Sequence, residues 1–203
     1  VSVMYVNNEV GAIEPIEEIA SLVHGRNPAI LLHVDAIQAY GKLVIHPKKQ
    51  GIDLLSVSAH KFHGPKGVGF LFIDGRVKIH PLLYGGGQQK DLRSGTENVP
   101  GIAGMGAAAQ EMYTDHQEKV DYITGLKDYM IDRMGQLEGV TVNSLKGGQG
   151  APQIVSAGFA GVRSEVLLHA LEEKGIYVSS GSACSSNHPA ISGTLKAIGV
   201  RKE

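Results

Sequence analysis

Short apolar runs, each followed by polar residues, fill the first third of the chain. They cover residues 1–6, 29–36, 53–59 and 67–73. A segment that opens with Pro15, residues 15–25, instead has apolar side chains at helical spacing. Continuously apolar strands separated by helix or loop are typical of a mostly parallel sheet covered on both faces. We therefore expect an α/β fold whose ligand crevice lies outside the carboxyl ends of the strands.

From residue 98 the pattern becomes helical. Six apolar residues recur at intervals of three and four: Val120, Ile123, Leu126, Met130, Met134 and Leu137. A strand is expected at 153–161, a helix at 164–175 with Ser164 as N-cap and Gly175 just past its end, and a short strand at 176–180. We expect residues 1–97 to be part of a large domain, and residues 98–203 to form an interdomain helix and a smaller α+β domain.

Composition narrows the class of protein. The chain has 203 residues, of which 42% are hydrophobic and 19% charged, so it can bury a core. A net charge of −1 gives no reason to expect nucleic acid as a partner, and no apolar run is long enough to cross a bilayer. One cysteine suits a reducing compartment, most simply the cytoplasm. Because the chain starts inside a strand-like run without methionine, we expect a piece of a longer protein.

The stretch "SAHKFHGPKG" places Lys61 at the end of an expected buried strand, beside Ser58 and His60. Most lysines are solvated surface residues. An amine becomes a usable nucleophile at neutral pH when it is desolvated or lies near another cation. Lys61 is therefore a candidate for a Schiff base, with its neighbours holding a phosphate group.

The stretch "HVDAIQ" places Asp35 near the end of another expected strand. An aspartate there is commonly a turn or helix cap. Alternatively, its carboxylate keeps a pyridinium nitrogen protonated, which pyridoxal phosphate chemistry needs together with a Schiff-base lysine. Gln38 could then donate to the phenolate oxygen of that cofactor. Asp35 and Lys61 on adjacent strand ends are more specific than either residue alone.

A metal site is the rival interpretation. His33, Asp35, His60 and His63 could supply imidazole and carboxylate ligands. The sequence lacks H-x-x-x-H and C-x-x-C spacing, and Lys61 would add positive charge beside the ion. We therefore predict no metal and give His63 a structural role in the turn.

Two glycine-containing loops carry further candidates. A lone cysteine is most often a small buried hydrophobe, but Cys184 stands in "SSGSACSS", where an exposed thiol could act as a nucleophile or sulfur acceptor. Residues 84–98 are either a plain linker or an anion site that includes Arg93, Ser94 and Thr96.

Five motifs in order along the chain, "VNNEVGAIEPI", "HVDAIQAYGK", "SAHKFHGPKGVGFLF", "GGGQQKDLRSGTENVP" and "VSSGSACSS", resemble the cysteine desulfurases. These are pyridoxal-phosphate enzymes of the class V aminotransferase type, with the fold of type I (aspartate aminotransferase-like) PLP-transferases. The S-G-S-A-C loop is similar to the branch that supplies sulfur for iron–sulfur clusters.

The resemblance implies a role for each matching residue. Lys61 would form the Schiff base and move the substrate α-proton, and Cys184 would take sulfur from L-cysteine as a persulfide. The cofactor would be held by Asp35 at the pyridinium nitrogen, Gln38 at the phenolate oxygen, Ser58 and His60 at the phosphate, and Thr96 at the phosphate of a partner subunit in a homodimer. Asn8 would help bind the substrate carboxylate, and a sulfur acceptor or scaffold protein would be the partner.

Three alternatives stay open from the sequence. The protein could be another class V aminotransferase, a selenocysteine lyase, or a truncated non-catalytic module that binds a sulfur acceptor or scaffold. The resemblance also implies that the phosphate loop and the ring-stacking histidine precede Val1, and that a carboxylate-binding arginine follows Glu203. We therefore expect the 203-residue chain by itself to bind the cofactor weakly and to be inactive.

Overall fold

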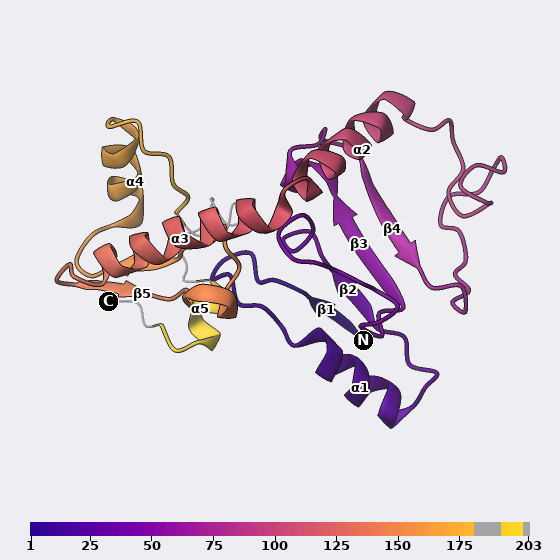
Figure 1. Ribbon diagram of the computed structural model, residues 1–203, viewed down its shortest axis with the longest axis horizontal. Coiled ribbons are helices and arrows are strands. Elements are labelled where there is room, and N and C mark those ends of the chain that lie inside the picture. The colour runs from indigo at the N-terminus through magenta and orange to yellow at the C-terminus, as the bar shows by residue number, and fades with distance from the viewer. Residues whose placement is uncertain (181–191, 201–203) are drawn as a thin grey trace. The chain divides into compact units, whose positions relative to one another are not determined.

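A computed structural model describes residues 1–180 and 192–200 of the chain. The chain folds as two compact units. The first comprises residues 1–6 and 14–118, and the second comprises residues 7–13 and 119–203. Figure 1 shows the sheet of the first unit in indigo and magenta and the second unit mainly in orange and yellow.

The first unit is built on a four-stranded sheet in the order β1-β2-β3-β4. The strands are β1 (Ser2–Met4), β2 (His33–Asp35), β3 (Leu54–Ser58) and β4 (Gly69–Ile73). The first three strands are parallel, while β4 pairs antiparallel with β3. The helix α1 (Ile16–Arg26) connects β1 to β2. The predicted mostly parallel α/β sheet is thus confirmed, with one antiparallel edge strand.

The two faces of this sheet differ in burial. Val34 and Leu55 lie opposite each other in the register, and both are buried. Asp35 and Ser56, the next pair, point to the other face and are only half-buried. Successive side chains along a strand point to opposite faces of the sheet, so neighbouring residues alternate between the two faces. The expectation of full burial on both faces is therefore wrong for the described residues: one face forms the core and the other carries polar side chains.

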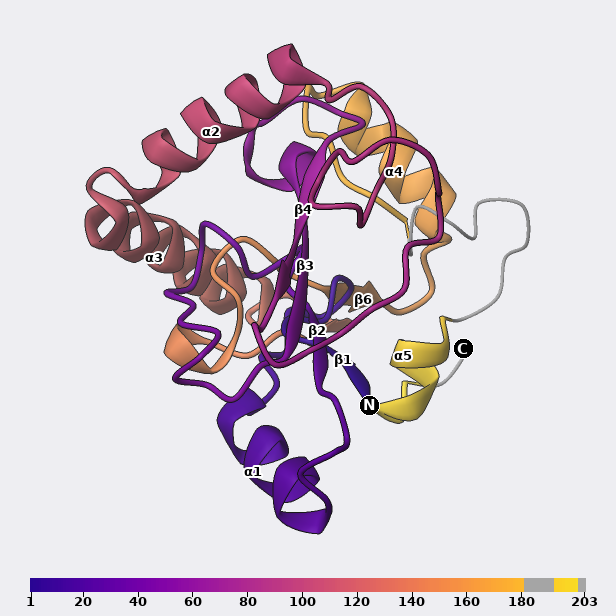
Figure 2. The same ribbon diagram turned by 90° about the vertical axis from the view of Figure 1, so that its right-hand side faces the viewer.

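An aromatic cluster fills the space between the sheet and the helix α2 (Val99–Tyr113). Phe62 is fully buried, and the ring of Tyr40 lies 4.9 Å from it and 5.3 Å from that of Phe70. Tyr113, the last residue of α2, packs edge-on against Tyr40 at 5.4 Å. Figure 2 shows the sheet nearly edge-on with α2 to one side. The cluster anchors the short helical turn η1 (Ala59–Phe62), which follows β3.

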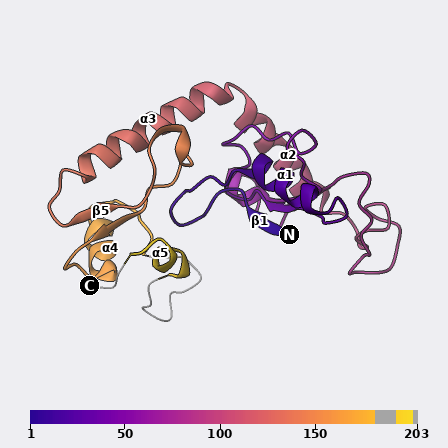
Figure 3. The same cartoon turned by 90° about the horizontal axis from the view of Figure 1, so that it is seen from below.

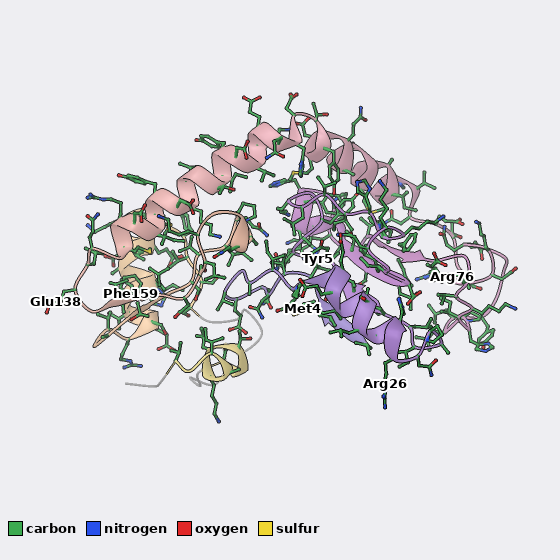
Figure 4. The ribbon with its side chains drawn as sticks, turned by 60° about the horizontal axis from the view of Figure 1, so that its bottom comes forward. Met4, Tyr5, Arg26, Arg76, Glu138 and Phe159 are labelled. Carbon is green, nitrogen blue, oxygen red and sulfur yellow. The ribbon has the colours of Figure 1, made fainter. Side chains whose placement is uncertain are left out.

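A buried carboxylate fixes the opposite end of the strands. Asp53 accepts hydrogen bonds from the backbone N–H of Leu32 and from Arg76, and it pairs with His24 of α1 at 2.9 Å. Arg76 also donates to Asp74 at 2.8 Å. Figure 4 shows Arg76 on the segment that follows β4. These bonds satisfy a carboxylate that is only 4% exposed, which would otherwise be costly to bury.

Close packing of α1 gives a testable prediction. Gly51 has a φ of +70°, and a Cβ added there would lie 2.9 Å from the Cβ of Ala20. Gly67 has a φ of +78° with open space around it. We expect Gly67→Ala to lower the free energy of unfolding by about 1–2 kcal/mol through the left-handed backbone alone. Gly51→Ala should cost a further ~1–3 kcal/mol, because the methyl group also overpacks the helix.

Urea denaturation of the two variants in parallel measures this difference. Equal losses at the two positions would contradict the close contact between Gly51 and α1.

The second unit combines most of a long helix with a small antiparallel sheet. The helix α3 (His116–Met134) leads into β5 (Val140–Val142), which pairs with β6 (Ala157–Phe159). The turn η2 (Gly147–Gln149) lies between these strands, and α4 (Ser164–Glu172) and α5 (Gly193–Ala197) follow them. Figure 3 shows α3 running into β5.

The helix α3 holds the loop between β5 and β6 through polar side chains. Lys127 is 3% exposed and donates to the backbone carbonyl of Ala151 at 2.9 Å. Asp128 accepts from the backbone N–H of Gly147, and Lys146 pairs with Asp132 at 2.7 Å. Burial lowers the pKa of Lys127, while the neighbouring Asp128 raises it. The carboxylate thus partly compensates the buried ammonium group.

Several predictions for the second half of the chain are wrong. Leu126, Met130 and Leu137 belong to the predicted apolar face of the helical region, yet they are 51%, 40% and 56% exposed. The polar residue Lys127 is buried in their place. Residues 176–180 form no strand, and β5 was not predicted.

The predicted cap of α4 is also wrong. Arg163 is the N-cap, without a side-chain cap bond, and Ser164 is the first helical residue. Gly175 follows the helix with a φ of +74°, which agrees with its predicted place just past the end. Across the described ranges 1–180 and 192–200, no helix is long and apolar enough to cross a membrane.

Candidate active site

The candidate residues of the first unit gather where the parallel strands end. Asp35 is the last residue of β2 and pairs in register with Ser56 of β3. Ser58 is the last residue of β3, on the same face two residues further on, and η1 follows it with His60 and Lys61. The predicted placement of Asp35 and Lys61 after neighbouring strands is therefore confirmed. Their chemical roles stay a prediction.

The turn η1 separates its apolar side chains from its polar ones. Ala59 and Phe62 are fully buried, whereas His60 and Lys61 are exposed. His63 ends the turn with a φ of +67°, and its backbone N–H donates to the carbonyl of Ala59. The buried pair fixes the backbone, and the exposed pair is thereby presented to a ligand at the strand ends.

Ser58 and His60 are joined directly. The Ser58 hydroxyl and Nδ1 of His60 lie 2.8 Å apart, so each orients the other. A hydroxyl and an imidazole N–H are both donors that suit a phosphate oxygen. The pair is a polar corner beside Lys61 that fits an anionic group.

Asp35 also organises the turn that follows β2. Its Oδ1 accepts the backbone N–H of Ile37 at 2.9 Å, and the N–H groups of Ala39 and Tyr40 then bond to the carbonyl of Ala36. Gln38 lies half-buried in this turn. The same carboxylate therefore caps the turn, as the simpler interpretation of the sequence predicted, and stands at the end of a parallel strand.

Lys42, which was not among the candidates predicted from the sequence, also belongs to this region. Its side chain is buried, and Nζ donates to the backbone carbonyl of Lys61. Burial, and secondly the positive charge of Lys61, lower the pKa of Lys42 from 10.5 to about 8. The one available signal was its position just before the apolar residues Leu43, Val44 and Ile45, where a lysine is unusual.

The lowered pKa of Lys42 predicts a pH dependence of stability. Between pH 8 and 10.5 the unfolded chain keeps a proton on Lys42 that the folded chain has released. The free energy of unfolding should therefore rise with pH across this window, by up to about 3 kcal/mol for the full shift.

The measurement is the difference in unfolding free energy between the wild type and Lys42→Met at several pH values. As the pH rises from 8, the free energy of unfolding of the wild type should increase relative to that of Lys42→Met. A difference that stays constant between pH 7 and 10.5 would contradict the burial of a charged Lys42.

The remaining candidate residues belong to other segments of the chain. Asn8 is exposed and belongs to the second unit, next to Asn7, whose side chain accepts the backbone N–H groups of Glu9 and Val10. Thr96 is exposed in the segment between β4 and α2, which contains neither helix nor strand. Cys184 lies outside the described residues.

His33, one of the four residues weighed as metal ligands, makes hydrogen bonds through both ring nitrogens. His33 Nδ1 lies 2.7 Å from the Ser2 hydroxyl, and Nε2 lies 3.1 Å from the Ser56 hydroxyl. Both ring nitrogens are thus engaged across three strands. In the part of the chain that the structure describes, no group of three or more His, Cys, Asp or Glu residues could hold a metal ion.

Comparison with known proteins identifies the family. The model of the aminotransferase class-V family matches residues 1–201. The chain belongs to the aminotransferase class-V family.

Relatives of this class V chain carry related names. Cysteine desulfurase IscS from Dictyoglomus turgidum is 41% identical over 201 residues, covering 98% of this chain and 50% of that protein. Cysteine desulfurase IscS from Methanosarcina thermophila is 42% identical over 203 residues, covering 100% of this chain and 50% of that protein. The chain spans about half the length of these curated relatives.

Solved structures give the same picture. A NifS-like protein superposes with a TM-score of 0.89 at 38% identity, covering 100% of this chain and 52% of that one. The structure titled SspA in complex with cysteine superposes with a TM-score of 0.76 at 31% identity, covering 98% and 54%. The class V chain therefore shares the fold of NifS-like proteins.

Proposed function

We propose that the protein to which this chain belongs is a pyridoxal-phosphate-dependent cysteine desulfurase. The observation that carries the proposal is the grouping of Asp35, Ser58, His60 and Lys61 at the carboxyl ends of β2 and β3. The similarity to proteins named cysteine desulfurase supports it. A solved relative, SspA in complex with cysteine, supports L-cysteine as the substrate.

The side chains at this edge fit the parts of pyridoxal phosphate. The Asp35 carboxylate suits a protonated pyridinium nitrogen, and the Ser58–His60 corner suits the phosphate. Gln38, half-buried in the turn that Asp35 caps, would donate to the phenolate oxygen. Lys61, exposed beside the corner, would bond the aldehyde carbon. When bound, the cofactor supplies an electron sink that weakens the bonds at the substrate α-carbon.

The chain's own residues would carry the remaining steps. Asn8 would orient the substrate carboxylate, and the Lys61 amine would move the α-proton. The Cys184 thiolate would attack the sulfur of L-cysteine, so that the carbon–sulfur bond breaks, a sulfur–sulfur bond forms on the enzyme, and L-alanine leaves. The persulfide would then pass to a sulfur acceptor or a scaffold for iron–sulfur clusters.

We also propose the setting of this activity. Residues 1–97 would be part of a large cofactor-binding domain, and residues 98–203 an interdomain helix and a smaller domain. Thr96, exposed in an irregular segment, would reach the phosphate of a partner subunit in a homodimer. The single cysteine of the chain supports the cytoplasm as the compartment.

The role of Cys184 gives the experiment that separates this function from its rivals. In the full-length protein, Cys184→Ala should abolish sulfide and persulfide formation from L-cysteine, while Ser182→Ala, two residues away, should keep it. Cofactor absorbance should be unchanged in both variants. The measurement is the rate of alanine and sulfide production.

Each rival function gives a different result. Unchanged activity in Cys184→Ala would favour another class V aminotransferase or a selenocysteine lyase. A full-length protein that never takes up pyridoxal phosphate would favour a non-catalytic binding module.

A further inference from the structure

We propose that Lys42 is a positioning residue for Lys61: its buried ammonium group holds the backbone carbonyl of Lys61 and sets the turn η1 against the turn that begins at Asp35. This inference deepens the proposed function and rests on it for its catalytic meaning. The contact between Lys42 and the Lys61 carbonyl can be tested without the cofactor.

The chain from Asp35 to Lys42 forms one hydrogen-bonded turn. Asp35 caps the turn, and the N–H groups of Lys42 and Leu43 bond to the carbonyl of Ala39 at 3.0 and 2.9 Å. Gly41 has a φ of +78°, which an L side chain rarely adopts, and its N–H donates to the Tyr113 hydroxyl at 3.2 Å. The turn is therefore a fixed element that leads from one candidate residue to Lys42.

The turn that begins at Asp35 packs against η1 at two places. A Cβ on Gly41 would lie 3.4 Å from the Cβ of Phe62, so the backbone of the turn packs directly on η1. One residue further on, Lys42 reaches the carbonyl of Lys61. The turn that begins at Asp35 and η1 are thus joined at two neighbouring places, Gly41 against Phe62 and Lys42 against the Lys61 carbonyl.

Lys127, also buried, is a useful comparison for Lys42. Lys127 donates to a backbone carbonyl in the same way, but Asp128 lies beside it and compensates its charge. Lys42 has no ion pair with a carboxylate among residues 1–180 and 192–200, and the charged group that acts on it is Lys61, a second cation. Lys42 therefore keeps its hydrogen bond to the Lys61 backbone without a neighbouring carboxylate to offset the burial of its charge.

Amide hydrogen exchange in the absence of cofactor tests the contact. In Lys42→Met, the His63 and Gly64 amides, which close η1 by bonding to the carbonyl of Ala59, should lose about tenfold in protection, the size expected for one lost hydrogen bond. The Leu32 amide, bonded to Asp53 at the far end of the strands, should be unchanged. Lys42→Arg, which keeps a charged donor, should recover part of the protection. An equal loss at all three amides would reduce Lys42 to a structural residue and overturn the proposal.

Titration of Lys42 in a folded variant gives a second, independent test. Lys61→Met removes the neighbouring positive charge, so the pKa of Lys42 should rise from about 8. Lys66→Met also removes one lysine, shortly after η1, and should leave the pKa of Lys42 unchanged. The readout is the pH dependence of Lys42 acetylation followed by peptide mass. An unchanged titration in Lys61→Met would overturn the proposal, and this test decides the matter if Lys42→Met does not fold.

The catalytic consequence is measured last, in the full-length protein. The rate at which pyridoxal phosphate becomes covalently attached at Lys61 should fall about tenfold in Lys42→Met and recover in part in Lys42→Arg. Equal rates in the wild type and Lys42→Met would overturn the positioning role. If the wild type attaches no cofactor at all, the proposed function fails, while the exchange and titration results still judge the Lys42 contact.

Discussion

Replacing Lys61 by alanine is expected to lower the desulfuration rate of the full-length protein by a factor of about 10⁴ or more, the scale seen when a nucleophile is removed. Lys61 is the exposed amine on a turn whose other residues are buried or hydrogen-bonded, and it lies beside the Ser58–His60 corner. Without its amine the cofactor loses its covalent anchor and the α-proton loses its base.

Lys66→Ala is the matched control for this substitution. It removes a second exposed lysine five residues along the chain and should leave the rate within a few-fold. Alanine production from L-cysteine measures both variants. A Lys61→Ala protein that keeps more than a tenth of the wild-type rate would contradict the assigned role.

Replacing Phe62 by alanine is expected to lower the free energy of unfolding by about 3–5 kcal/mol. Phe62 is fully buried, contacts the ring of Tyr40 at 4.9 Å, and lies under the turn that presents Lys61. Removing the ring leaves a cavity between that turn and the Tyr40–Tyr113 pair, which the surrounding backbone can fill only in part.

Tyr84→Ala is the control for aromatic loss at the surface. Tyr84 is 78% exposed, so its removal should change stability by less than about 0.5 kcal/mol. Urea denaturation followed by circular dichroism measures the free energy of unfolding of both variants. A loss below about 1 kcal/mol for Phe62→Ala would show that this residue is not part of the core.

The sequence was sufficient to predict the strand ends that carry the candidate chemistry. Asp35 and Lys61 each follow a short apolar run, and such runs pack as neighbouring strands because the backbone groups along both of their edges need partners. The polar residues at their carboxyl ends then lie along one edge of the sheet. This inference depends on local patterns only, so it holds for the described structure.

Features that depend on contacts far along the chain escaped prediction. The burial of Lys42 is one such feature, because its ammonium group bonds to the carbonyl of Lys61, 19 residues further along the chain. The outward position of Leu126 and Met130 on α3 likewise depends on Lys127 and Ile131 being buried instead. The strand β5 has only three residues, too few for an alternating pattern to stand out.

The site at which pyridoxal phosphate attaches covalently is the most direct test of Lys61 as the Schiff-base lysine. The full-length protein is incubated with the cofactor, reduced with borohydride, digested, and analysed by peptide mass. We expect the pyridoxyl group on the peptide that contains Lys61. Within that peptide it should be attached at Lys61 and not at Lys66. Attachment at another lysine, or none in a folded protein saturated with cofactor, would contradict this role of Lys61.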